Sequence, residues 1–212
     1  MSLILALHSS SNVLGIASYC LGDKNENALK VASFPLRRRL SNDLLTCIES
    51  VIPAKNWKQL VRLAVATGPG GFTSTRLTVA VARILAQQLE CPLDGVNSLF
   101  LAAHRFRTFA EPFIFERPFW LTQRLSPETI VAGCYIVDPL MIGGVRELVN
   151  PRLIRLNEVV QLEPRLNVQI EVEKDVVHLL RLSQIAMSNG SIAPWDKVTP
   201  LYLTSPLNKF SI

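Results

Sequence analysis

Residues 63–67 read LAVAT, residues 68–76 read GPGGFTSTR and residues 77–89 read LTVAVARILAQQL. The first segment is apolar, partly β-branched and bounded by a glycine-rich cluster, which is typical of a buried strand that ends in a tight turn. The last segment has the apolar periodicity of a helix. The sequence therefore predicts a strand, a stiff glycine-rich loop and a helix in direct succession.

The glycine-rich loop is a candidate binding site for a nucleotide or phosphate. The first N–H groups of a helix have no partner within the helix, and glycine lets a ligand approach the backbone closely. Arg76 is a cation at the positive end of the helix dipole, so we expect it to have an anionic neighbour or a specific hydrogen bond. The candidate binding residues are Gly68, Gly70, Gly71, Thr73 and Arg76.

A structural interpretation of the same residues is the alternative: the glycines only turn the chain, and the helix packs on its sheet. The sequence has no Gly-Lys-Ser/Thr of a P-loop, and residues 68–71 do not have the spacing of the dinucleotide-binding fingerprint. The residue types leave both interpretations open.

The helix that follows the loop is apolar around most of its circumference. Its polar side chains form one narrow stripe, made by Arg76, Arg83, Gln87 and Glu90. Such a helix is buried on more than one side. One side can pack on its own sheet, and the other needs a second helix of the chain or a partner subunit.

The loop and its surroundings resemble a known family. GPGGFTSTR at residues 68–76, the apolar helix and PLDGVNSL at residues 92–99 resemble the Gly-Pro-Gly-Ser-Phe-Thr-Gly-x-Arg signature and the downstream Gly-Val-Ser-x-Leu of the TsaB (YeaZ) family, relatives of the TsaD (Kae1, glycoprotease-like) proteins. The resemblance implies an α/β fold of the actin, Hsp70 and sugar-kinase type (ASKHA, RNase H-like). It further implies an N-terminal lobe over residues 1–106, with the loop and the interface helices, and a smaller, divergent C-terminal lobe over residues 107–212.

The same resemblance implies a non-catalytic scaffold in the synthesis of threonylcarbamoyladenosine in tRNA. Such a subunit dimerises with and activates a TsaD-like transferase, and a TsaE-like ATPase is a further partner. The complex binds the tRNA, and the chain alone can form a homodimer. ATP and a metal then belong to the partner complex, and the chain has no cofactor, metal or catalytic residue of its own. The expected interface residues lie on two helices: Leu44, Ile48, Val79, Arg83 and Leu85. The alternative is that these residues form intramolecular core.

Three positions depart from the family pattern. His8 and Thr122 stand where relatives carry aspartate, and Leu40 stands where relatives carry histidine. A carboxylate can hold a hydrated magnesium ion, whereas imidazole binds a hard cation weakly. The departures argue against ATP hydrolysis by this chain.

An enzyme is the alternative function, either an ATP-dependent kinase of the same fold or a peptidase. Kinase chemistry needs magnesium-binding carboxylates beside the phosphate loops. A metallopeptidase needs zinc-ligand spacing, which His8, His104 and His178 do not have. Ser9 and Ser74 have no recognisable base nearby in the sequence, although a base could be distant along the chain.

The composition is that of a globular protein. Of 212 residues, 49% are apolar and 18% are charged, which leaves apolar surface to bury and favours an oligomer or a complex. The formal net charge of +5 is compatible with RNA handling, and the basic run at residues 37–39 is either a solvated loop or a phosphate contact. Four cysteines without metal spacing, together with the lack of a signal peptide and of any apolar run of membrane length, predict a soluble, cytoplasmic protein.

The remaining chain is predicted from periodicity and turn residues. A helix is expected to be capped within residues 41–43 and to end near residue 52, and residues 107–118 should form a linker. No motif is recognisable in residues 140–173. The other predicted elements are strands at residues 3–7, 14–19, 29–35, 119–122 and 129–136, and helices at residues 98–107 and 175–188.

Overall fold

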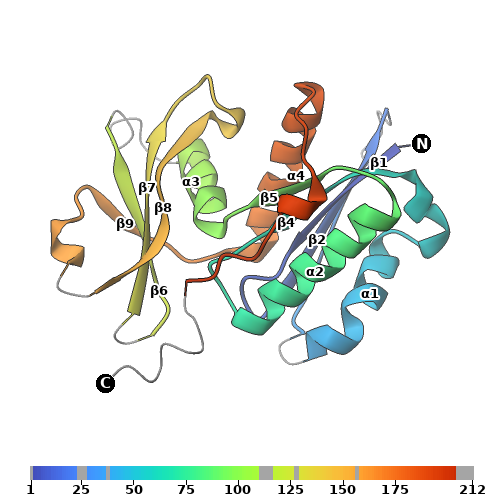
Figure 1. The fold of residues 1–212 in the computed structure, drawn as a ribbon, viewed down its shortest axis with the longest axis horizontal. Coiled ribbons are helices and arrows are strands. Elements are labelled where there is room, and N and C mark those ends of the chain that lie inside the picture. Colours follow the sequence, from blue (N-terminus) through green and yellow to red (C-terminus); the bar gives the residue numbers. More distant parts are fainter. Residues whose placement is uncertain are drawn as a thin grey trace.

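Two β-sheets, each with helices packed against it, make up the computed structural model of the protein (Figure 1). The structure describes residues 2–22, 28–36, 39–109, 117–126, 129–155 and 158–203. Within these residues the first sheet contains β1 (Ser2–His8), β2 (Leu14–Leu21), β3 (Leu29–Phe34), β4 (Leu60–Ala66) and β5 (Leu93–Val96). The second sheet contains β6 (Phe119–Arg124), β7 (Thr129–Val137), β8 (Val145–Arg155) and β9 (Arg165–Asn167).

The helices divide between the faces of these sheets. The α-helices are α1 (Leu40–Val51), α2 (Phe72–Gln88), α3 (Ser98–Phe109) and α4 (Val172–Ser188). Short 3-10 turns are η3 (Ala54–Gln59), η5 (Ile142–Gly144), η6 (Val159–Gln161) and η7 (Trp195–Lys197). No helix within the described residues is long and apolar enough to cross a lipid bilayer.

The first sheet has the strand order β3-β2-β1-β4-β5. β1, β2 and β3 form an antiparallel meander, so the predicted hairpin of the first two strands is confirmed. β4 and β5 run parallel to β1, and each crossover to them contains a helix. The α/β, actin-like fold expected from the resemblance is confirmed by this sheet and by the second one.

Alternate residues of β1 supply two separate cores, because successive side chains of a strand point to opposite faces. Leu5 and Leu7 pack with α1 and α2 on one face of the sheet. Ile4 and Ala6 pack with α3 and α4 on the other face. Both faces are therefore covered, which explains why residues 3–7 of β1 and 63–66 of β4 are apolar without alternation.

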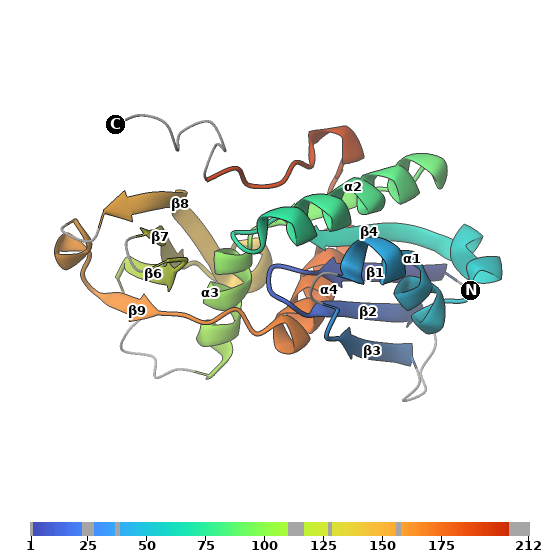
Figure 2. The same cartoon turned by 90° about the horizontal axis from the view of Figure 1, so that it is seen from below.

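The second sheet has the order β8-β7-β6-β9. The predicted hairpin of β6 and β7 is confirmed as an antiparallel pair. One face of this sheet packs on α3, which lies between the two sheets (Figures 1 and 2). The other face is covered in part by the segment around η6.

Helix α4 follows the second sheet in sequence but packs on the first sheet. A buried ion pair fixes it to α3: the Arg105 Nε donates to Asp175 Oδ1 over 2.8 Å, and both side chains are buried. The same guanidinium donates to the Glu171 carboxylate and to the Gln169 carbonyl. The lobe boundary at residue 106 stays a prediction, and the path of α4 shows that the C-terminal half completes the core of the first sheet.

Several predicted bounds need correction. Helix α1 begins at Leu40, and no side chain caps it through a hydrogen bond, so the cap expected at residues 41–43 is wrong. Helix α4 begins three residues earlier than predicted, at Val172. Residues 140–173, where no motif was recognised, contain β8 and β9. The predicted linker lies partly outside the described residues, as do Arg37 and Arg38 of the basic run.

Candidate functional site

The glycine-rich loop is packed against the turn between β1 and β2. Gly71 N–H donates to the Ser10 carbonyl over 3.3 Å, and Ser98 N–H donates to the Gly68 carbonyl over 2.7 Å. A Cβ at Gly70 would lie within 3.0 Å of the Ser10 backbone. The close approach of the two backbones therefore explains the glycine at position 70 without any ligand.

Serine hydroxyls hold the β1–β2 turn in place beneath this loop. The Ser9 hydroxyl donates to Thr78 Oγ1 over 2.7 Å, which ties the turn to α2. The Ser10 and Ser98 hydroxyls lie 2.7 Å apart and tie the turn to the start of α3. Because these hydrogen bonds are buried, the turn, the loop and two helices form one connected polar cluster.

His8, at the departure from the family pattern, is fully buried beside this cluster. Its Nδ1 accepts the Ser10 N–H over 3.3 Å, and its Nε2 has no hydrogen-bond partner among the described residues. Burial lowers the pKa of His8 from 6.5 to about 3, so the imidazole is neutral at physiological pH. Thr122, the second such departure, is also buried and donates to the Leu166 carbonyl over 3.3 Å. Leu40, the third, is the first residue of α1 and is buried in the core of the first sheet.

A cavity of about 950 Å³ adjoins the outer side of the loop. Gly71 and Thr73, at the start of α2, line it together with Ser11, Asn12 and Ser41. The first N–H groups of α2 are free of helical partners by the geometry of a helix start. These groups and the hydroxyls can bind an anion. The other predicted residues, Gly68, Gly70 and Arg76, line a separate hollow of about 60 Å³, and the phosphate site stays a prediction.

Arg76 lies apart from this cavity. Its guanidinium stacks over the Phe72 ring at 3.2 Å and over the Tyr202 ring at 4.5 Å from the ring centroids. These cation–π contacts offset the unfavourable interaction of the Arg76 cation with the positive end of the helix dipole. The described residues therefore give Arg76 aromatic neighbours where an anionic one was expected.

The predicted interface residues are mostly buried within the chain. Leu44, Ile48, Val79 and Leu85 belong to the core between α1, α2 and the first sheet. Arg83 donates to the Asp196 carbonyl over 3.3 Å. Contact of these five residues with a partner stays a prediction, and in the chain alone they hold α1 and α2 to the sheet.

Their neighbours Leu45, Ala80 and Ile84 are exposed and form what we call the α1–α2 face. Leu45 is 51% exposed and Ile84 is 57% exposed. These three residues were not among the predicted interface residues, because helical periodicity identifies the most apolar stripe of a helix but not what covers it. The apolar residues on α2 are too many for its contact with the sheet alone, and this excess is the sequence feature that indicates an exposed apolar face.

Among the described residues, no cluster of three or more His, Cys, Asp or Glu side chains could hold a metal ion. The fold does join two distant histidines: His104 and His178 lie with their Nδ1 atoms 3.0 Å apart in the contact of α3 with α4. Burial lowers the pKa of His104 to about 4 and lowers that of His178. Two neutral imidazoles can share one hydrogen bond in this way, with one nitrogen protonated and the other not.

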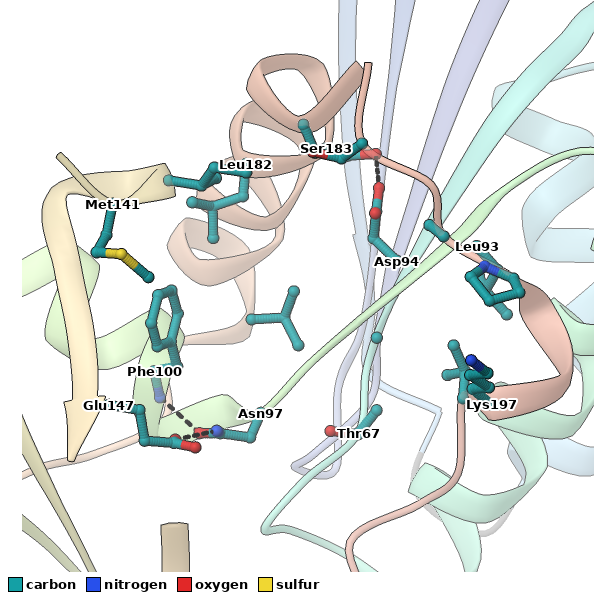
Figure 3. Close-up of a pocket in the computed structure, with 18 of the residues that line it drawn as sticks. Thr67, Leu93, Asp94, Asn97, Phe100, Met141, Glu147, Leu182, Ser183 and Lys197 are labelled. Atoms are coloured by element: carbon teal, nitrogen blue, oxygen red, sulfur yellow. Dashed lines mark hydrogen bonds between the residues drawn. The ribbon is translucent and has the colours of Figure 1, made fainter. Parts of the chain in front are cut away.

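A second cavity, of about 740 Å³, lies beyond β5 between α4 and the start of β8 (Figure 3). At one end Asn97 joins the two sheets: its Nδ2 donates to Glu147 over 2.5 Å, and its Oδ1 accepts the Phe100 N–H at the start of α3. At the other end Asp94 accepts hydrogen bonds from Arg62 and from Ser183. Burial is the main cause of the raised pKa of Glu147.

Comparisons with known proteins relate the chain to one group. The family model of TsaD, described as tRNA N6-adenosine threonylcarbamoyltransferase, matches residues 36–122. The tRNA threonylcarbamoyladenosine biosynthesis protein TsaB of Buchnera aphidicola is 22% identical, over 95% of this chain and 98% of the relative. The protein of the same name from Bacillus subtilis is 29% identical, over 50% of this chain and 45% of the relative.

Solved structures agree with this relationship at the level of the fold. YeaZ from Pseudomonas aeruginosa superposes with a TM-score of 0.70 at 19% identity, over 96% of this chain and all of that one. A second structure, of a protein described as similar to peptidase YeaZ from the same organism, gives a TM-score of 0.71 with the same coverage. The chain is therefore similar to TsaB proteins in sequence and to YeaZ in fold, and it carries the glycine-rich motif at residues 68–76.

Proposed function

We propose that the chain is a non-catalytic subunit of the machinery that makes threonylcarbamoyladenosine in tRNA. In this proposal it dimerises with a TsaD-like transferase and activates it, a TsaE-like ATPase joins the pair, and tRNA is bound through the complex. Two relatives of the chain are named as tRNA threonylcarbamoyladenosine biosynthesis proteins, which supports this pathway.

The observation that carries the proposal is the exposed α1–α2 face. Leu45 and Ile84 are large apolar side chains, each more than half exposed, on two helices that pack side by side. Burying each in a partner contact would contribute about 1.5–3 kcal/mol. The face therefore fits a helical partner surface with matching apolar side chains.

The residues around the glycine-rich loop support a kinase less well than a non-catalytic subunit. The described residues that line the cavity beside the loop include no Asp or Glu. His8 is buried and neutral where a magnesium-binding carboxylate would be required. ATP and a metal remain, in the proposal, with the partner complex.

A reconstituted reaction tests the activating role. The TsaD-like and TsaE-like proteins from the same source are incubated with tRNA, ATP, a divalent metal and the activated threonylcarbamoyl donor, with and without this chain, and the modified nucleoside is quantified. We expect product only when the chain is present, and loss of product with Ile84→Arg. Full activity of the transferase without this chain would contradict the proposal.

A further inference from the structure

The start of α2 carries three stacked side chains at the surface, which we call the Arg76 stack. The Arg76 guanidinium lies 3.2 Å from the centroid of the Phe72 ring and 4.5 Å from that of the Tyr202 ring. Tyr202 comes from the segment after η7, which passes the start of α2 (Figure 2). Phe72 is 46% exposed and Tyr202 is 62% exposed. The guanidinium covers only one face of each ring, so flat aromatic surface remains open to a ligand.

Packing does not account for this exposure. Arg83, further along α2, makes a similar contact, 5.9 Å from the Trp195 centroid, but Trp195 also packs against the core of the first sheet. Phe72 and Tyr202 belong to none of the four apolar cores that the described residues form. Large aromatic side chains that are exposed outside a core are typical of binding sites. The Arg76 stack is therefore a candidate contact for a ligand with flat groups.

The cavity of about 950 Å³ lies directly beside the stack, because Phe72 lines it. Its described lining residues include no Asp or Glu, and five of them carry hydroxyl or amide groups: Ser11, Asn12, Ser41, Thr73 and Ser74. Arg39 also lines it, with a side chain that is 78% exposed, but Asp43 lies 3.0 Å from that guanidinium. Arg76 has no ion-pair partner within the described part of the chain. The stack and the cavity therefore offer hydrogen bonds around one uncompensated positive charge.

An unpaired nucleotide matches these features. A base has two flat faces that stack on aromatic rings and guanidinium planes, and its ribose and phosphate accept hydrogen bonds beside a positive charge. Bases inside a duplex have both faces covered by their neighbours, so a duplex does not match. The proposed function already brings an RNA to the complex, and an unpaired nucleotide of tRNA is therefore the ligand that fits the stack.

We propose that the Arg76 stack binds an unpaired nucleotide of tRNA. The base stacks on the open ring surface of Phe72 or Tyr202, and the adjoining ribose and phosphate form hydrogen bonds with the side chains of the cavity. The inference rests on the proposed function for the identity of the RNA, and it adds direct contact between this chain and that RNA. Ile84 of the α1–α2 face lies about 18 Å beyond Phe72 along α2. The chain can therefore hold the RNA and the transferase on different parts of one helix.

Fluorescence polarisation of a labelled twelve-nucleotide single-stranded RNA, with the purified full chain, tests the inference. The single strand should bind at least about tenfold more tightly than the duplex it forms with its complement, because stacking requires an unpaired base. Unlabelled tRNA should compete with the probe. Phe72→Leu combined with Tyr202→Leu keeps apolar surface but removes both rings, and it should weaken binding about fivefold to a hundredfold. Arg76→Lys keeps the charge but loses the guanidinium plane, and it should weaken binding about threefold or more.

Matched variants supply the controls. Phe72→Tyr combined with Tyr202→Phe keeps both rings and should bind RNA within about twofold of the wild type. Arg83→Lys makes the same change as Arg76→Lys on the same helix, and Ile84→Ser removes an exposed apolar side chain of the α1–α2 face. Neither should change the affinity for RNA by more than about twofold. Circular dichroism shows whether each variant stays folded.

Equal affinity for the single strand and the duplex would overturn the inference, and so would unchanged affinity with Phe72→Leu and Tyr202→Leu. If these two substitutions spared RNA binding but broke the pairing with the TsaD-like protein, the stack would be a protein contact, and the inference would again be overturned. The proposed function fails separately. A chain that binds RNA through the stack, but neither pairs with nor activates the TsaD-like protein, would contradict the proposed function and support direct RNA binding.

Discussion

Substitution of His8 by asparagine should reduce the acid sensitivity of the fold. His8 is fully buried, and burial lowers its pKa from 6.5 to about 3. His8 therefore binds a proton near pH 6.5 in the unfolded chain, but only near pH 3 in the folded chain. Stability is present in full above pH 6.5 and falls as the pH drops below that value.

The size of this effect follows from the two pKa values. At pH 5 the unfolded state is about 1.5 pH units below the ordinary pKa of histidine. Protonation of this one group therefore stabilises the unfolded state by about 2 kcal/mol between pH 7 and pH 5. The result hardly depends on the folded pKa, as long as that pKa lies well below 5. An asparagine removes the titrating group, and its Oδ1 can accept the Ser10 N–H that His8 Nδ1 accepts now.

Urea unfolding of the wild type and of His8→Asn at pH 7 and pH 5 measures the difference. The free energy of unfolding of the wild type should fall by about 2 kcal/mol more than that of the variant over this range. His104 contributes in the same direction, but it is present in both proteins and cancels in the comparison. Equal losses in the two proteins would refute the buried, neutral state of His8.

Two further predictions concern packing and buried charge. Gly70→Ala should lower the free energy of unfolding in urea by about 1–3 kcal/mol, because the added Cβ would contact the Ser10 backbone. Gly71→Ala should lower it less in the same titration, because the Cβ there would contact only a side chain that can move. Asp175→Ala should cost about 3–5 kcal/mol by leaving the Arg105 guanidinium buried without its main partner, measured by the same method; a loss below about 1 kcal/mol would contradict the buried ion pair.

The sequence predicted the fold well where periodicity and turn residues agree. The strand, loop and helix predicted over residues 63–89 correspond to β4 and α2, because an apolar run, a glycine cluster and a helical repeat follow one another without interruption; β4 begins three residues before the predicted strand and α2 five residues before the predicted helix. Strand β8 was missed, because Gly143 and Gly144 before it and Pro151 within it suggest a loop. Its pairing with β7 overrides these local preferences, since the hairpin buries Val145 and Ile154.

The candidate site could be predicted only in part. The loop was found from its glycines, but the contact of Gly70 with Ser10 joins residues 60 positions apart and leaves no local pattern. The stacking of Arg76 on Tyr202 and the pairing of His104 with His178 are long-range contacts of the same kind. The burial of Val79 explains why helical spacing alone could not separate core from interface on α2.

The mass of the complex formed with the TsaD-like protein tests the proposed function most directly. Light scattering on a sizing column should give a one-to-one heterodimer for the wild type, and Leu45→Arg or Ile84→Arg should abolish it while the chain stays folded. Leu148→Arg, at a comparably exposed leucine on β8, should leave the heterodimer intact. Substitutions at Ile48 or Val79 are unsuitable, since both side chains are buried and a charge there would unfold the chain. A wild-type chain that elutes apart from the TsaD-like protein would contradict the scaffold function.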